Sequence, residues 1–368
     1  MMPRKGTLPW LLVLLLAGLA GCGGGPSSSS GTGTSPGTSS NHLVYVSVPE
    51  GNTISAFRVS NTSGNFTNLV GSPFPAGNSP GAMLVHPSDQ FLYVVNRAED
   101  TVSLFNIDST VGSLAEVLPR AATGVTPIAM TMTSNGNMLF VLNQLSGSIS
   151  VYSIKSADGA LAQVTGSPFP TAPNPVAFAV TPSGKFLYVV NSNLALVFAY
   201  TISGTGVLQQ AGPPVAVGTG PFAVAVDPAE KFVYVANSQA DTVSILSINS
   251  TTGALSEVIG SPFATGTSPI SIAVAGPYVY IADQGTNDIT AFTIDSTTGF
   301  PTVITGSPFV INTPQLLVAD PNANFIYVLA VRSVFVNEFS LDPSTGVLTV
   351  GPESSSVITP PVGIAVGR

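Results

Sequence analysis

The sequence predicts an all-β fold, a seven-bladed β-propeller of four-stranded antiparallel blades whose ring is closed when the C-terminal strand completes the N-terminal blade. Three observations support this prediction. Two columns of residues recur seven times at intervals of 45 to 48 residues, each interval holds four short strand patterns, and the chain ends on a lone first-strand pattern. A constant period of about 40 to 50 residues with four strands per unit is typical of propeller blades.

The first column is an aromatic residue inside an apolar run, and the second is a proline that opens an alternating run. The aromatic column consists of Tyr45, Tyr93, Phe140, Tyr188, Tyr234, Tyr280 and Tyr327. The proline column consists of Pro80, Pro127, Pro175, Pro221, Pro269, Pro314 and Pro361. Because two independent columns agree on seven units, the repeat outweighs any single motif.

The elements of one unit follow from its local patterns. Pro221–Val226 alternates large and small side chains and stops at Asp-Pro, so it predicts a first strand. Phe232–Asn237 is a continuous apolar run ended by Asn and predicts the second strand. Thr242–Ile248 alternates again as a third strand, and residues 254–259 form the fourth. No segment of the unit has a helical period.

A glycine recurs in the turn between the third and fourth strands. It stands at Gly64, Gly112, Gly159, Gly206, Gly253, Gly299 and Gly346. A left-handed residue closes this kind of turn, and a Cβ there would clash. Asp108, Asp295 and Asp342 are expected to cap these turns with their side chains and not to bind calcium.

The two ends of the repeat complement each other. The first unit starts at a second strand, residues 44–46, and the chain ends with a first strand at residues 361–366. The C-terminal strand should therefore lie beside the N-terminal one and remove the open sheet edge.

Composition excludes several classes of protein. Only 8% of the 368 residues are charged, and 10 basic against 18 acidic side chains give a net charge of −8. Such a chain is no nucleic-acid binder and does not seek anionic headgroups. Cys22 is the only cysteine, so disulfides and thiolate metal sites are excluded. No His pair at metal spacing, phosphate loop or haem motif occurs, and we expect no metal and no cofactor.

The N-terminus carries a targeting signal. Arg4 and Lys5 precede an apolar stretch, Leu8–Ala20, that is too short to span a bilayer. The stretch leads into Leu-Ala-Gly-Cys ending at Cys22, which resembles the bacterial lipobox. We therefore expect residues 1–21 to be a lipoprotein signal peptide; an ordinary secretory leader is the alternative.

Three segments are expected along the chain. Residues 22–42 form a lipidated Cys22 and a tether of Gly, Ser, Thr and Pro, which has no apolar surface to bury. Residues 43–368 form the propeller. The membrane should thus be contacted through lipid alone. Gly23 follows the cysteine where retention in the inner membrane is associated with Asp, so the resemblance implies an anchor in the outer membrane of the cell envelope.

The strand and turn motifs resemble those of a known family. Residues 92–96, 187–191 and 233–237 look like YVTN-type repeats, and Asp-x-x-Thr-Gly-x-Leu at 342–348 resembles the lactonase-family propellers. Gly-Ser-Pro-Phe motifs add to this at Gly71, Gly166, Gly260 and Gly306. The family includes 6-phosphogluconolactonases and fungal carboxymuconate cyclases, and the likeness spans about residues 43–368.

The resemblance implies lactone chemistry but supplies no catalytic residue. Carboxymuconate-type members are understood to use a His, a Glu and arginines at one channel mouth. The two histidines here are His42, expected at the end of the tether, and His86, expected in a strand-ending turn. No residue of this chain matches a catalytic position of the family, so the catalytic residues stay unassigned.

Candidate ligand-binding residues gather at one predicted channel mouth. Loops that follow second strands should share one face with the loops that precede the first-strand prolines, and propeller sites usually lie at such a mouth. The candidates are Arg97, Asp100, Asn143, Asn191, Asn237, Asp241, Asp283 and Arg332. Arg97 and Arg332 are the only cations in the loops after second strands, so an acidic ligand should meet them.

Two functions follow from these observations. The scarcity of histidine and basic residues favours a lipid-anchored extracytoplasmic propeller that acts as a binding or scaffold module without catalysis. Its partner would be an envelope protein, a glycan or a small acidic lactone, and no nucleic acid. The alternative is a lactone hydrolase of the propeller lactonase family, 6-phosphogluconolactonase-like, in which an activated water attacks the ester at the channel mouth.

Overall fold

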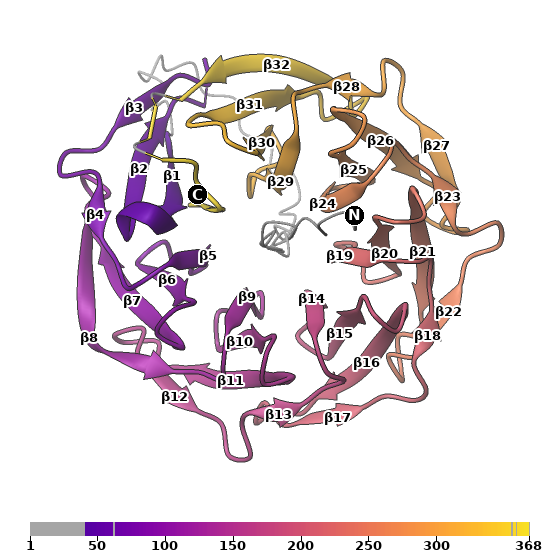
Figure 1. The fold of residues 1–368 in the computed structure, drawn as a ribbon, viewed down its shortest axis with the longest axis horizontal. Helices are drawn as coiled ribbons and strands as arrows, with labels where there is room; N and C mark the ends of the chain where they lie inside the picture. Colours follow the sequence, from indigo (N-terminus) through magenta and orange to yellow (C-terminus); the bar gives the residue numbers. More distant parts are fainter. Residues whose placement is uncertain (1–40, 62, 355, 358, 368) are drawn as a thin grey trace, which may run out of the picture.

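The computed structural model describes residues 41–61, 63–354, 356–357 and 359–367. These residues form seven antiparallel sheets arranged radially around an axis, as the sequence predicts (Figure 1). The expected leader, Cys22 and residues 23–40 of the expected tether lie outside the described residues. Within the described part, the one helical element is a short 3₁₀ turn, η1 (Pro49–Gly51), and no helix could cross a bilayer.

Each blade begins with two buried strands near the axis. The first strands, for blades 1 to 7 in order, are β33 (Gly363–Val366), β5 (Pro80–Val85), β9 (Pro127–Met132), β14 (Pro175–Val180), β19 (Pro221–Val226), β24 (Pro269–Ala275) and β29 (Pro314–Ala319). The second strands are β1 (His42–Val48), β6 (Phe91–Asn96), β10 (Met138–Asn143), β15 (Phe186–Asn191), β20 (Phe232–Asn237), β25 (Tyr278–Asp283) and β30 (Phe325–Ala330). The strands of the unit 221–248 thus have the predicted bounds.

The two outer positions of each blade are less buried. The third strands are β2 (Thr53–Val59), β7 (Thr101–Ile107), β11 (Ser148–Ile154), β16 (Leu196–Ile202), β21 (Thr242–Ile248), β26 (Asp288–Ile294) and β31 (Val336–Leu341). The outer strands are β3 (Phe66–Asn68) with β4 (Phe74–Pro75), β8 (Leu114–Ala122), β12 (Leu161–Gln163) with β13 (Phe169–Pro170), β17 (Leu208–Gln210) with β18 (Val215–Ala216), β22 (Leu255–Glu257) with β23 (Phe263–Ala264), β27 (Pro301–Val303) with β28 (Phe309–Val310), and β32 (Leu348–Glu353). Five of the seven outer strands are therefore split in two.

The ring closes as predicted. β33 pairs antiparallel with β1, with Val44 opposite Val366 and Ser47 opposite Gly363. The C-terminus consequently lies beside the N-terminal blade (Figure 1). β1 begins at His42, one residue before the expected start of the propeller, so His42 belongs to the first blade and not to the tether.

The aromatic column forms the core and also joins neighbouring blades. Its seven side chains are at most 2% exposed. Four of its tyrosines donate a hydrogen bond across the blade interface to the turn glycine of the next blade. The pairs are Tyr45 with Gly112, Tyr93 with Gly159, Tyr188 with Gly253 and Tyr280 with Gly346, at 2.7 to 3.1 Å. The recurring glycine thus closes its own turn, and its carbonyl also accepts a hydrogen bond from the hydroxyl of the tyrosine in the preceding blade.

The Gly-Ser-Pro-Phe motif lies at the break in four of the five split outer strands; the split of β17 and β18 has no such motif. In each case its serine accepts a hydrogen bond from a third-strand N–H at the point where the outer strand is interrupted. These bonds are Ala56 to Ser72, Val151 to Ser167, Ile245 to Ser261 and Ala291 to Ser307, at 2.8 to 3.0 Å. A buried N–H without a partner is unfavourable, and the serine hydroxyl supplies one. The motif is therefore structural.

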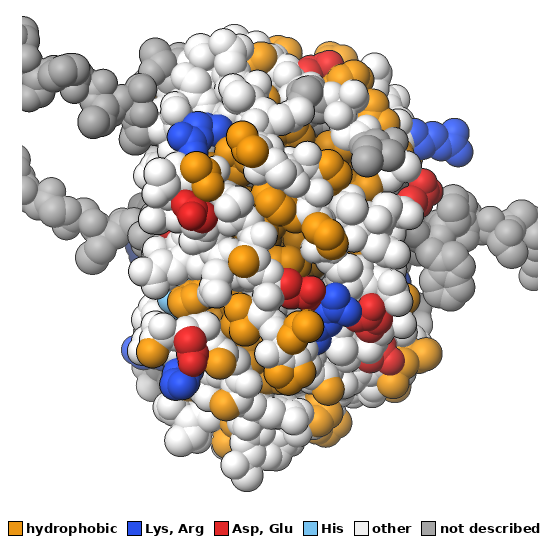
Figure 2. All heavy atoms as spheres, turned by 90° about the vertical axis from the view of Figure 1, so that its left-hand side faces the viewer, with side chains coloured by type: hydrophobic (Ala, Val, Ile, Leu, Met, Phe, Trp, Pro, Cys, Tyr) orange, Lys and Arg blue, Asp and Glu red, His pale blue; other side chains and the backbone are white. Residues whose placement is uncertain are grey.

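The turn aspartates cap their turns, as predicted. Asp108 accepts from the N–H groups of Thr110 and Val111, and Asp295 does the same for Thr297 and Thr298. No calcium-type cluster of acidic groups exists among the described residues. The side of the ring over β4, β7 and β8 is mainly hydrophobic and neutral polar surface, on which acidic and basic side chains lie in small groups (Figure 2).

Candidate functional site

The predicted mouth exists as one face of the ring. In blade 2, the N–H of Arg97, just after β6, donates to the carbonyl of Ser79, just before β5, at 3.1 Å. In blade 5, Ser238 N–H bonds Gly220 O at 2.8 Å in the same way. We call this side, formed by loops such as 76–79 and 97–100, the proline face. The opposite side, formed by loops such as 227–231 and 295–300, is the hairpin face.

The strand-end amides of the predicted site lie beneath the proline face. Asn143, Asn191 and Asn237 are at most 1% exposed. Asn143 Nδ2 donates to the hydroxyls of Ser148 and Ser150 in its own blade. In three blades the preceding loop places a glycine over a strand-end asparagine, and an added Cβ would come within 3 Å of the amide side chain. These pairs are Gly77 with Asn96, Gly124 with Asn143 and Gly218 with Asn237. The amides therefore support the loops from below.

Asp283 occupies the same strand-end position in blade 6 but carries a carboxyl group. It is 0% exposed, and its Oδ2 accepts from the hydroxyl of Thr290 at 2.5 Å. Its Oδ1 has no hydrogen-bond partner among the described residues. Burial raises the pKa of Asp283 to about 6, because the charged form loses its hydration.

Asp100 and Asp241 join neighbouring blades on the proline face. Each has a left-handed backbone, with φ of 54° and 56°. Asp100 Oδ1 accepts from the N–H of Thr126 and Asp241 Oδ1 from that of Ser268, both at 2.8 Å. Asn52 and Asn287 make the same bond in other blades: to Ser79 and Thr313. These two predicted ligand residues thus hold the loop of the next blade.

Arg97 and Arg332 are the two cations of the predicted site, and they lie in the loops that follow β6 and β30. Arg332 is exposed, and Arg97 is partly buried. Among the residues that the structure describes, neither guanidinium has an ion pair or a side-chain hydrogen bond. Burial lowers the pKa of Arg97, since desolvation disfavours its charge. A partly buried cation without a partner is stabilised by an anionic or oxyanionic ligand.

The neighbouring carboxylates are engaged elsewhere, which leaves Arg97 without one. Glu99 in the same loop forms an ion pair with Arg120 of β8 at 2.7 Å. Arg120 also pairs with Glu116 at 2.7 Å, and Asp100 holds the loop of blade 3. The acidic residues of blade 2 therefore fix its outer strand and loops.

Both histidines lie away from the proline face. His86 follows β5, where its Nδ1 accepts from the N–H of Ser88 at 3.1 Å and its Nε2 lies 3.1 Å from Gly136 O. The expected turn role of His86 agrees with this placement. His42 is 1% exposed in the interface between blades 1 and 7, where its ring bonds the hydroxyl of Tyr327 and the side chain of Asn61. Burial lowers the pKa of both rings.

Seven blades of four strand positions each, closed by one C-terminal strand, define a seven-bladed β-propeller. The model of the family described as lactonase, 7-bladed beta-propeller, matches residues 38–179, 168–266 and 260–362. The chain belongs to this family, as its strand and turn motifs indicate.

Solved structures share the fold across almost the whole chain. A Bacteroides fragilis protein provisionally described as a 6-phosphogluconolactonase is 23% identical, with a TM-score of 0.75 over 91% of this chain and 100% of its own. The periplasmic gluconolactonase of Pseudomonas aeruginosa is 18% identical, with a TM-score of 0.72 over 89% and 99%. None of the proteins with curated functions matches this sequence.

Two features of the structure were not predicted. The loop between β24 and β25 has two residues, whereas its counterpart in blade 5 has five, and it borders a cavity on the hairpin face. Glu338 lies opposite Tyr327, where the other blades carry aliphatic residues. Both are departures from the repeat, so a column-by-column comparison of the seven units is the signal that would have found them.

Proposed function

We propose that this protein is a lactone hydrolase whose substrate binds at the proline face. Water adds to the lactone carbonyl, the ring C–O bond breaks, and the ring oxygen takes up a proton to give a hydroxy acid. Arg97 contacts the carbonyl oxygen, and its guanidinium stabilises the negative charge that develops there. The observation that carries this assignment of the site is the partly buried guanidinium of Arg97, which has no partner among the described residues.

Family membership supports hydrolysis over pure binding. The scarcity of histidine and basic residues favours a binding or scaffold module, whereas the match to the lactonase family supports hydrolysis. The structural neighbours at 18 to 23% identity support the fold alone. Because neither histidine lies on the proline face, the proposed reaction relies on charge stabilisation by arginine and not on a histidine base.

Replacing Arg97 by alanine is expected to lower kcat/KM for lactone hydrolysis by about 10². The oxyanion would lose its charged donor, whereas the fold would keep every blade contact. The measurement is pH-stat hydrolysis of glucono-δ-lactone and of its 6-phosphate by the purified full-length protein, corrected for spontaneous hydrolysis. Arg97→Lys should recover part of the rate because it restores the charge but not the planar geometry.

Gln144→Ala is the matched control for this experiment. Gln144 follows Asn143 in blade 3 as Arg97 follows Asn96 in blade 2, and both backbones bond the residue before the first strand. Its loss should leave the rate unchanged. If the folded wild-type protein hydrolyses neither lactone above background, or if both variants lose activity equally, the proposed function is wrong.

We further propose that the protein is held at the cell envelope by a lipid on Cys22, with the propeller outside the cytoplasm. The sequence around Cys22 supports this, as does the tether that follows it. Cys22→Ser should move the protein from the membrane fraction to the soluble fraction, as followed by immunoblot. Arg4 and Lys5 would remain, so export continues. A variant that still sediments with membranes would contradict the lipid anchor.

A further inference from the structure

The loops that join first and second strands form a chain of contacts on the hairpin face. His86 of blade 2 reaches Gly136 O of blade 3, and Ser134 Oγ donates to Pro182 O of blade 4 at 2.5 Å. Ser183 Oγ of blade 4 then donates to Glu230 of blade 5 at 2.8 Å. Each loop thus covers the space beside its neighbour.

The chain of contacts stops between blades 5 and 6. Five residues separate β19 from β20, whereas only Gly276 and Pro277 separate β24 from β25. An added Cβ on Gly276 would meet nothing within 4 Å, although one on Gly136 would touch His86 and one on Gly184 would touch Thr133. The shorter loop leaves a cavity of about 290 Å³ beside blade 5.

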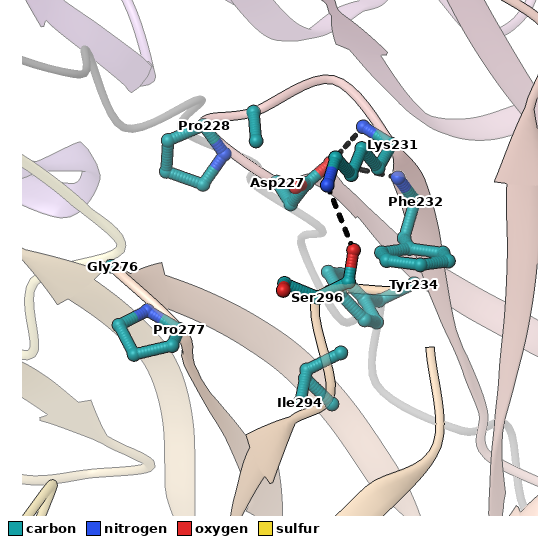
Figure 3. Close-up of a pocket in the computed structure, with 10 residues that line it drawn as sticks. Asp227, Pro228, Lys231, Phe232, Tyr234, Gly276, Pro277, Ile294 and Ser296 are labelled. Atoms are coloured by element: carbon teal, nitrogen blue, oxygen red, sulfur yellow. Dashed lines mark hydrogen bonds between the residues drawn. The ribbon is translucent and has the colours of Figure 1, made fainter. Parts of the chain in front are cut away.

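The cavity is mostly apolar, and its polar lining consists of Asp227, Lys231 and Ser296 (Figure 3). Phe232, Tyr234 and Ile294 line it, and Pro228 and Pro277 lie at opposite sides of its opening. Among the described residues, Lys231 forms no ion pair, and its Nζ donates one hydrogen bond, to Ser296 O at 2.9 Å. Two of its three N–H donors are therefore available.

Asp227 lies beside Lys231, but its carboxylate accepts hydrogen bonds from backbone N–H groups. Its Oδ1 accepts from the N–H groups of Lys231 and Phe232 at 2.6 and 2.7 Å, which closes the loop of blade 5. The side chain is 8% exposed. The charge of Lys231 favours the ionised forms of Asp227 and Asp295, but among the described residues its ammonium forms an ion pair with neither, so it can still pair with the carboxylate of a ligand.

We propose that this cavity is a second binding site, separate from the proline face, that takes a small aromatic monocarboxylate. The ring would enter between Pro228 and Pro277 onto Phe232, and the carboxylate would pair with Lys231. The volume is near the lower end of the range for small-molecule pockets, about 300 Å³, which suits a ligand of about ten non-hydrogen atoms. The apolar lining selects the ring, and charge complementarity selects the acid.

Blade 4 provides an internal comparison. Lys185 precedes Phe186 as Lys231 precedes Phe232, so the two lysines occupy the same position in their repeats. Beside Lys185, however, the full-length loop of blade 5 approaches, and Glu230 bonds Ser183. The same lysine without the shortened neighbouring loop should therefore bind no ligand.

The test is binding of 3-phenylpropionate to the purified full-length protein, measured by isothermal titration calorimetry and saturation-transfer NMR. Lys231→Met keeps the apolar stem and removes the charge, and it should weaken binding about tenfold. Lys185→Met should leave the dissociation constant unchanged. Ala229→Trp, at an exposed position on the rim, should abolish binding by filling the cavity.

Three results would overturn this proposal. They are no binding by the wild-type protein, equal weakening by Lys231→Met and Lys185→Met, and equal affinity for the neutral 3-phenylpropanol. Arg97→Ala should leave binding of the probe unchanged, because Arg97 lies on the other face. Absence of lactonase activity therefore would not contradict the second binding site, and absence of probe binding would not contradict the proposed lactonase function.

Discussion

Replacing Gly363 by alanine is expected to destabilise the propeller by about 2 to 3 kcal/mol, although the change adds a single methyl group. Gly363 opens β33 and lies opposite Ser47 in the strand pair that closes the ring. A Cβ at this position would lie 2.2 Å from Gly81 O and 2.7 Å from Ser47 Oγ. Gly81 O belongs to the backbone of blade 2 and accepts a hydrogen bond from Ser47 Oγ at 2.7 Å. Moving either oxygen away from the new methyl group would therefore break this hydrogen bond or shift the backbone.

Other blades show that the cost arises from the closing interface and not from alanine itself. The register places Gly363 in the same column as Ala129, Ala177 and Ala223, which are buried in blades 3, 4 and 5. Urea unfolding followed by tyrosine fluorescence would measure the loss of stability. Gly204→Ala is the control, because a Cβ there meets nothing within 4 Å. Equal stability of both variants would contradict a closely packed seam.

The sequence was sufficient for the architecture because each blade repeats the same local chemistry. Strand periodicity, turn glycines and the aromatic column each depend on residues close together in the chain. Seven copies of one pattern remove the ambiguity of any single strand. The closing pair of β1 with β33 followed from the complementary ends of the repeat, without knowledge of any long-range contact.

The roles of the polar residues could not be predicted in the same way. Asp100 and Thr126 are 26 residues apart, and their contact depends on how two blades lie against each other. Asn143 is buried because a glycine of a preceding loop lies over it. Sequence patterns identify such residues as loop residues but do not reveal which neighbour takes up their hydrogen bonds. Arg97 differs because its guanidinium forms no ion pair with any of the described residues.

Glu338 is the second departure from the repeat that has a measurable consequence. It faces Tyr327 across β30 and β31. At the same register the other blades carry Ala56, Leu104, Val151, Ala199, Ile245 and Ala291. The carboxyl group is 2% exposed, Gly64 of blade 1 packs against it, and its Oε2 has no hydrogen-bond partner among the described residues.

The interface around Glu338 is also the one where the tyrosine contact changes. Tyr327 bonds His42 of blade 1, while four other tyrosines of the column bond a turn glycine. Burial, with a smaller contribution from Asp320, raises the pKa of Glu338 to about 8. The titratable groups near it are thus Tyr327, Asp320 and His42.

Glu338→Gln is expected to stabilise the protein at pH 9 by about 2 to 4 kcal/mol and to change little at pH 5, since one pKa unit is worth about 1.4 kcal/mol. In the unfolded chain this carboxyl loses its proton near its ordinary pKa of 4.5, but in the folded state it keeps the proton to about pH 8. The folded state therefore binds more protons over this window, and stability falls as the pH rises through it. Glutamine mimics the protonated acid and cannot ionise, so the variant does not undergo this loss of folding stability at high pH.

The experiment compares urea unfolding of both proteins at pH 5, 7 and 9. The difference between wild type and variant is the quantity to follow, because His42, whose pKa burial lowers, affects the stability of both in the acidic range. Glu257→Gln, at an exposed carboxylate of β22, should give no pH-dependent gain. A gain that is the same at all three pH values would show that Glu338 is ionised in the folded protein, in which case the last and first blades enclose a buried charge.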